Sequence, residues 1–203
     1  MFGLLGRKTR TEVGAVGGFG KIPALGDFVR TPSPSAEMLA FESWLTRAME
    51  TGEARHGSSF RDAFAAGPAH AFLWSGSLDK KNRGLVAGVI APSHDAVGRR
   101  FPIVVGAPLP SAPLAAQPHT APLVLFDFFL HAAAAISRAA HTRSQADFHA
   151  QVTSTPAPSL ENASALAARY GTWAQGRREA RSASAPKRAF QMSAARRPCA
   201  QVP

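Results

Sequence analysis

Two short segments, residues 20–29 (GKIPALGDFV) and residues 91–102 (APSHDAVGRRFP), constrain this chain more than any other feature of its sequence. In each of them, glycine and proline fix the backbone next to a carboxylate and a base, a combination that holds a loop in one shape. Neither segment matches an enzyme motif. We therefore expect two loops of defined conformation that carry no catalytic chemistry.

The residues between these loops predict two helices. Ser33-Pro34 is typical of a helix N-cap followed by proline at the first helical position, and it predicts a helix over about residues 34–50. The apolar side chains on its buried face are Met38, Phe41, Leu45, Ala48 and Met49. A shorter helix is expected to carry Phe60 and Phe64 and to end at Gly67.

Apolar runs of strand length predict a sheet. The runs at residues 69–74, 85–91 and 101–107 are expected to form strands, and residues 13–19 are expected to form a first strand. The short polar stretch 76–84 favours an antiparallel hairpin. We therefore predict an α/β or α+β fold with a central, largely antiparallel sheet flanked by helices in three α/β/α layers.

The second half of the chain predicts more helix and one long connection. Residues 123–140 have helical periodicity, and a further helix is predicted between residues 159 and 170. The Pro-rich segment 107–122 is predicted to be a surface connection.

The net charge of +10 is unevenly distributed along the chain. It is +2 in residues 1–12, +2 in residues 13–174 and +6 in residues 175–203. A nucleic-acid-binding face needs clustered bases on a folded surface, which the nearly neutral central segment does not offer. We expect a basic N-terminal extension (1–12), a single α/β domain (13–174) and an Arg/Ala-rich disordered tail (175–203) with too little apolar surface to fold.

We expect a cytoplasmic protein, because the sequence is compatible with a reducing compartment and does not require export. Cys199 is the only cysteine, so no intrachain disulfide can form. The apolar stretch at residues 1–6 is too short for a signal-peptide core. Residues 101–126 lack charged residues but contain six prolines, so they cannot cross a bilayer as one helix.

Two patterns invite an enzymatic interpretation. Residues 14–21 are similar to a phosphate-binding loop, but Ala15 and Ile22 stand where that motif needs a glycine and a hydroxyl. Ser93-His94-Asp95 contains the residue types of a hydrolytic triad, yet adjacent side chains project in different directions and cannot form the relay unaided. The same residues are also typical of a simple turn, in which Asp95 accepts backbone hydrogen bonds and Gly98 has a positive φ.

Metal and cofactor sites are not signalled. Asp127 and His131 lie one helical turn apart, but a metal ion needs a third ligand. We therefore predict a noncatalytic protein with no cofactor and no metal site.

The two loops are expected to meet and brace each other. Asp27 and Asp95 are natural partners for Lys21, Arg99 or Arg100, because partly buried ion pairs fix loop geometry. These five residues form the candidate site. They serve either to bind a partner protein or to hold the loops in shape, and the sequence leaves both uses open.

The loops resemble the paired signatures of the TagF/ImpM family of bacterial type VI secretion accessory proteins. The signatures read G-K-x-P-x-x-G-D-F-V and P-S-x-D-x-V-G-R-x-F-P, and Phe41, Trp44 and Leu45 stand at family-like positions between them. The resemblance implies a cytoplasmic post-translational regulator that acts by protein–protein contact, as a repressor of apparatus assembly or firing. The implied partner is the forkhead-associated-domain scaffold of the system, or another cytoplasmic component.

The alternative hypothesis is weak, nonspecific nucleic-acid binding through the basic tail. Residues 175–203 hold seven arginine and lysine side chains that could contact phosphates regardless of base sequence. A mobile Arg-rich segment binds polyanions weakly whatever its role, so nucleic acid is the less favoured partner.

Overall fold

The computed structural model divides the chain into two units, Met1–Ala167 and Ala168–Pro203. The described residues are 12–77, 83–110, 114, 118–161, 165, 168, 171, 172 and 175. The first unit contains the sheet and the helices that cover it. The basic N-terminal extension up to residue 11 and the tail from residue 176 lie outside the described residues, and so does most of the helix predicted at 159–170, of which Ala165 and Ala168 are helical.

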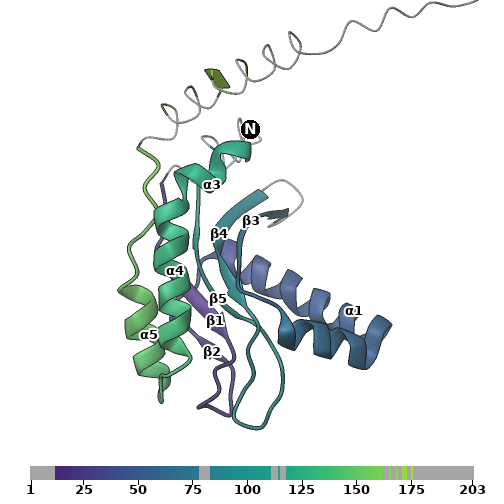
Figure 1. Ribbon diagram of the computed structural model, residues 1–203. Coiled ribbons are helices and arrows are strands. Elements are labelled where there is room, and N and C mark those ends of the chain that lie inside the picture. Colours follow the sequence, from purple (N-terminus) through teal and green to yellow (C-terminus); the bar gives the residue numbers. More distant parts are fainter. Residues whose placement is uncertain are drawn as a thin grey trace, which may run out of the picture. The chain divides into compact units, whose positions relative to one another are not determined.

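The first unit is built on a five-stranded sheet in which all neighbouring strands are antiparallel (Figure 1). The spatial order is β2-β1-β5-β4-β3. The strands are β1 (Gly17–Gly20), β2 (Val29–Arg30), β3 (His70–Ser77), β4 (Arg83–Ala91) and β5 (Ile103–Pro108). The predicted hairpin is confirmed, since β3 pairs with β4 at every position from His70 to Ser77.

Helices cover both faces of this sheet (Figure 1). Helix α1 (Ala36–Ala66) covers one face, while α4 (Phe126–Ala139) and α5 (Gln145–Thr153) cover the other. The α1 layer packs through Phe19, Met38, Phe41, Leu45, Val86 and Val104. The α4 and α5 layer packs through a larger cluster that includes Val105, Phe128, Ala132, Phe148 and Val152. The predicted three-layer α/β/α architecture is therefore confirmed.

Helix α1 begins two residues later than Ser33-Pro34 predicts. Its N-cap is Ser35, whose hydroxyl accepts a hydrogen bond from the Met38 amide at 3.2 Å and so satisfies a free N–H of the first turn. Ser33 instead has a φ of 51° and lies in the preceding turn. Of the five side chains predicted to share a buried face, Ala48 is exposed.

A kink at Gly57 divides α1 into the two helices that the sequence predicts. Gly57 has φ 52° and ψ −123°, a conformation that glycine adopts far more readily than other residues. The ring of Phe60 then packs back against Gly52, where an added Cβ would lie 2.5 Å from the ring. The second half of the helix ends at Gly67, as predicted.

Several boundaries differ from the sequence prediction. Strand β1 begins at Gly17 instead of Val13, and the predicted helix over 123–140 is interrupted at Leu125, which separates α3 (Ala121–Val124) from α4. A 3₁₀ turn, η1 (Pro118–Thr120), precedes α3. The Pro-rich connection is also not confined to the surface, because Leu109 and Leu114 are almost fully buried in the core.

Helix α5 and strand β2 were not predicted. Helix α5 has nine residues and begins at Ser144, whose hydroxyl accepts a hydrogen bond from the Asp147 amide at 3.0 Å. Its buried side chains are only Phe148 and Val152, too few to show a helical period in the sequence. Strand β2 has two residues and is defined by its pairing with β1.

Replacing Phe148 with alanine tests whether α5 is part of the core. Phe148 is fully buried, so Phe148→Ala is expected to lower the free energy of unfolding by about 3–5 kcal/mol through lost burial and a cavity. Leu39→Ala, at an exposed position of α1, is the control and is expected to cost less than about 1 kcal/mol. Urea unfolding followed by tryptophan fluorescence measures both changes, and equal values would contradict the packing of α5.

Candidate functional site: two braced loops

The two loops singled out by the sequence lie at the same end of two neighbouring strands. The first loop connects β1 to β2, and the second connects β4 to β5. Because β1 pairs antiparallel with β5, with Phe19 opposite Val104, the chain leaves β1 where it enters β5. The sheet register therefore brings the two loops together.

Gly20 marks the closest approach of the two loop backbones. Its φ is 137°, and a Cβ added there would lie 2.2 Å from the carbonyl oxygen of Pro102. No side chain fits between these two segments, so the first glycine of one loop is matched to the last proline of the other.

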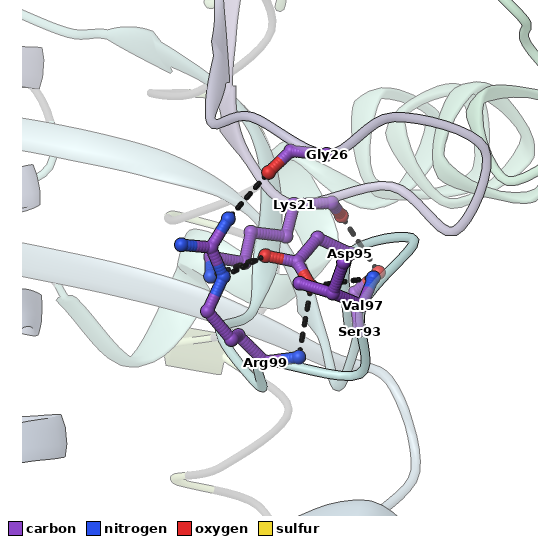
Figure 2. A network of polar contacts seen from close by, with 6 residues as sticks. All are labelled: Lys21, Gly26, Ser93, Asp95, Val97 and Arg99. Atoms are coloured by element: carbon purple, nitrogen blue, oxygen red, sulfur yellow. Dashed lines mark hydrogen bonds and ion pairs between the residues drawn. The ribbon is translucent and has the colours of Figure 1, made fainter.

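The carboxylate of Asp95 is the centre of the polar network that joins the loops (Figure 2). Its Oδ1 accepts hydrogen bonds from the amides of Val97 and Arg99 at 3.2 and 2.8 Å. Its Oδ2 accepts from Lys21 Nζ and Arg99 Nε, each at 2.7 Å. The two amide bonds and the φ of 84° at Gly98 form the turn predicted from the sequence.

Three further contacts tie the loops to each other through backbone carbonyls. The Ser93 hydroxyl donates to the carbonyl oxygen of Lys21 at 2.7 Å, and the Ala96 amide donates to the carbonyl oxygen of Leu25 at 2.9 Å. The Arg99 guanidinium also donates through Nη2 to the carbonyl oxygen of Gly26 (Figure 2). Sequence reasoning missed these contacts, because any residue can supply a backbone carbonyl.

Charge explains why a buried carboxylate is stable here. The Asp95 side chain is fully buried, and burial by itself would raise its pKa. The carboxylate accepts hydrogen bonds from the Lys21 ammonium and from the amide and guanidinium of Arg99, and the Lys21 charge also attracts it. Together these interactions outweigh the effect of burial and hold the pKa of Asp95 well below its ordinary value. The carboxylate is therefore ionised in the folded chain at neutral pH.

The structure brings together three of the five candidate residues, Lys21, Asp95 and Arg99. Asp27 is exposed and forms no hydrogen bond or ion pair within the described part of the chain, which corrects its expected pairing with a base of the other loop. The physical reason is that Lys21 and Arg99 both donate hydrogen bonds to Asp95. Arg99 in addition donates to the carbonyl oxygen of Gly26, the residue before Asp27, and not to the Asp27 carboxylate. Arg100 points to Asp62 of α1, with 3.9 Å between Nη1 and Oδ1.

The triad residue types do not form a catalytic relay. Ser93 donates its hydroxyl proton to a backbone carbonyl, Asp95 is occupied by Lys21 and Arg99, and His94 is exposed. Among the described residues, no group of three histidine, cysteine, aspartate or glutamate side chains is placed to hold a metal ion. No helix in the described ranges combines the length and the apolar character needed to span a membrane.

The outward side of the braced loops combines an apolar side chain with charged ones. Val97 is 71% exposed, and the Arg99 side chain is 61% exposed although its guanidinium holds the network. Asp27 and Arg100 are exposed at the same pair of loops. Beside them, a groove of about 590 Å³ lies between α1 and residues 98–101.

Comparison with known proteins identifies the class of this domain. The crystal structure of PA0076 from Pseudomonas aeruginosa PAO1, at 2.05 Å resolution, is similar with a TM-score of 0.54 and 25% sequence identity, over 73% of this chain and 69% of that chain. No curated protein matches the chain. Residues 17–155 match the model of the TagF N-terminal domain, which is type VI secretion system-associated. The three-layer domain with its two braced loops is thus a type VI secretion-associated domain, and the chain belongs to the TagF N-terminal domain family.

Substitution of Gly20 tests the close approach of the loops. Gly20→Ala introduces both an unfavourable φ and a clash with the Pro102 carbonyl, so we expect the free energy of unfolding to fall by more than about 3 kcal/mol. Gly26→Ala is the matched control in the same loop, since a Cβ there meets no atom within 4 Å. Thermal unfolding of both variants measures the difference, and a stable Gly20→Ala protein would contradict the observed loop contact.

Substitution of Asp95 tests the charge at the centre of the network. The ordinary carboxyl pKa of 3.8 applies in the unfolded chain, and the folded-state pKa is lower. The stabilisation is therefore complete above about pH 5 and is lost as the pH falls toward the folded-state pKa. We expect Asp95→Asn to lower the melting temperature at pH 7 by roughly 5–10 °C, and the difference from wild type to shrink by about pH 3.

Calorimetry across this pH range measures the effect of Asp95→Asn. Asp27→Asn is the control, because its exposed carboxylate forms no hydrogen bond or ion pair within the described residues. A deficit of Asp95→Asn that stays constant with pH would mean that shape, not charge, is what Asp95 contributes.

Proposed function

We propose that this protein is a noncatalytic accessory protein of a bacterial type VI secretion system, which acts in the cytoplasm to restrain apparatus assembly or firing through protein–protein contacts. The observation that carries the proposal is the match of residues 17–155 to a type VI secretion-associated domain. The braced loops provide a contact surface of fixed shape on that domain.

The geometry supports a division of roles among the candidate residues. Lys21 and Asp95 are directed inward and hold the loops, with 15% and 0% of their side chains exposed. Asp27 and Val97 are exposed and available to a partner, while Arg100 is exposed beside Asp62 of α1. Arg99 serves both roles, because its Nε is bound to Asp95 while most of its side chain is exposed.

The noncatalytic part of the proposal rests on how the reactive groups are used. Ser93 donates its hydroxyl proton to the Lys21 carbonyl of the other loop. Asp95 accepts from two amides of its own loop, from Lys21 and from Arg99, so neither side chain is aimed at a substrate. A loop held this firmly is suited to recognition, since little conformational entropy is lost when a partner binds it.

The partner we propose is the forkhead-associated-domain scaffold of the secretion system or another of its cytoplasmic components. An exposed valine beside charges of both signs offers a small apolar contact with a polar rim, the composition of many transient interfaces. Charge complementarity with Asp27 and the two arginines would set partner choice and association rate more than affinity.

Substitutions on the outward side of the loops test the proposal. The double variant Asp27→Lys with Val97→Ser should keep the melting temperature of wild type, because both side chains are exposed, and should fail to restore control of secretion. In a deletion strain, wild-type protein is expected to reduce the amount of secreted effector, and the double variant is expected to leave it at the deletion level. Secreted effector is measured by immunoblotting of culture supernatants.

The control variant is Leu39→Ser, an exposed apolar position on α1 outside the loops, which should complement like wild type. Affinity capture from nuclease-treated native lysate then identifies which secretion component is lost with the double variant. The proposal is overturned if deletion and overexpression both leave secretion unchanged and no type VI component is recovered.

A further inference from the structure

Among the described strands, one long edge strand lacks the charged residues, prolines and bulges that usually protect an edge against pairing. Strand β3 is last in the strand order, pairs with β4 in an unbroken one-to-one register, and meets no described strand on its outer side. Its sequence, HAFLWSGS, contains no lysine, arginine, aspartate, glutamate or proline. Edge strands are commonly protected by such residues, by bulges or by being short.

The opposite edge shows the contrast. Strand β2 has two residues, and one of them, Arg30, pairs with Glu42 of α1. It is therefore short and charged, as expected of an edge that stays single. Only the β3 edge among the described strands is long enough to extend the sheet.

Exposed apolar side chains flank the β3 edge on the α4 face. Ala71 and Leu73 of β3 face a groove of about 450 Å³ whose other wall is formed by Phe126, Leu130 and Ala133 of α4. Leu73, Phe126 and Leu130 are 36%, 58% and 55% exposed. Clusters of exposed large apolar side chains mark interaction surfaces.

We propose that β3 pairs antiparallel with β3 of a second copy of this chain, so that the five-stranded sheet becomes a ten-stranded sheet across a twofold axis. Antiparallel pairing of two identical strands is compatible with twofold symmetry and closes the interface on itself. Across this axis, equivalent faces of the two sheets lie on the same side of the joined sheet. The α4 helices of both copies then lie on one face of the joined sheet, and the α1 helices lie on the other (Figure 1).

Charge favours a second copy over a charged partner. Because β3 has no acidic or basic side chain other than His70, two copies bring no like-charged carboxylates, lysines or arginines together along the strand. The apolar stripes of α4 from the two copies border the same seam, where burial would stabilise the pair. An uncharged strand with an apolar border is complementary to itself.

The first test is the solution mass of the full chain by sedimentation velocity over a concentration series. We expect a monomer–dimer equilibrium for wild type. Leu73→Lys puts a charge on the seam and is expected to raise the dimer dissociation constant at least about tenfold. Ser75→Lys, at an exposed position on the same face of β3, is the second variant in case Leu73→Lys is unstable.

The control is Leu39→Lys, which places the same charge at a similarly exposed leucine of α1 and should leave the dissociation constant unchanged. Hydrogen exchange should show amide protection in His70–Ser77 that increases with protein concentration. A chain that remains monomeric throughout the series overturns the proposal. A dimer that both lysine variants on β3 leave intact, or one without concentration-dependent protection of β3, overturns it equally.

Discussion

The buried carboxylate of Asp95 is the group on which the conformation of the site depends. A charge that is removed from water must be matched by donors, and here two amides, an ammonium and a guanidinium supply them. Since the ammonium comes from one loop and the other donors come from the second, satisfying the charge also fixes the two loops against each other. The close approach of Gly20 to Pro102 makes the same connection through the backbone.

This arrangement separates what holds the surface from what the surface presents. Lys21 and Asp95 form a largely buried ion pair that holds the loops, whereas Val97 and Asp27 are exposed on the loop surface. The backbone that carries these exposed side chains cannot easily rearrange. A preformed surface loses less entropy on binding than a flexible one, so even a small contact area can recognise a partner. The rigid sheet below, whose β1 and β5 strands lead into the loops, provides the support.

The remainder of the domain offers surfaces of a different character. Beside the loops, both halves of the kinked helix α1 line a groove with residues 98–101. At the far edge of the sheet, β3 has no acidic or basic side chain other than His70, and it borders the apolar side chains of Phe126, Leu130 and Ala133 on α4. The two proposed contacts therefore use different surfaces of one domain: the charged, braced loops for a different protein and the uncharged strand edge for a second copy.

Local signals in the sequence were sufficient to predict those elements whose residues carry a strong pattern. Glycine, proline and apolar runs indicated the two ordered loops, the antiparallel hairpin, the division of α1 and the three layers, and the paired signatures indicated the family. Local signals could not show α5 or β2, because α5 buries only two side chains and β2 exists only through its pairing with β1. Likewise, the sequence offered Asp27 and Asp95 as equal partners for the bases. Only the register of β1 against β5 decided between them, since it placed Asp95 inside among the donors and left Asp27 at the surface.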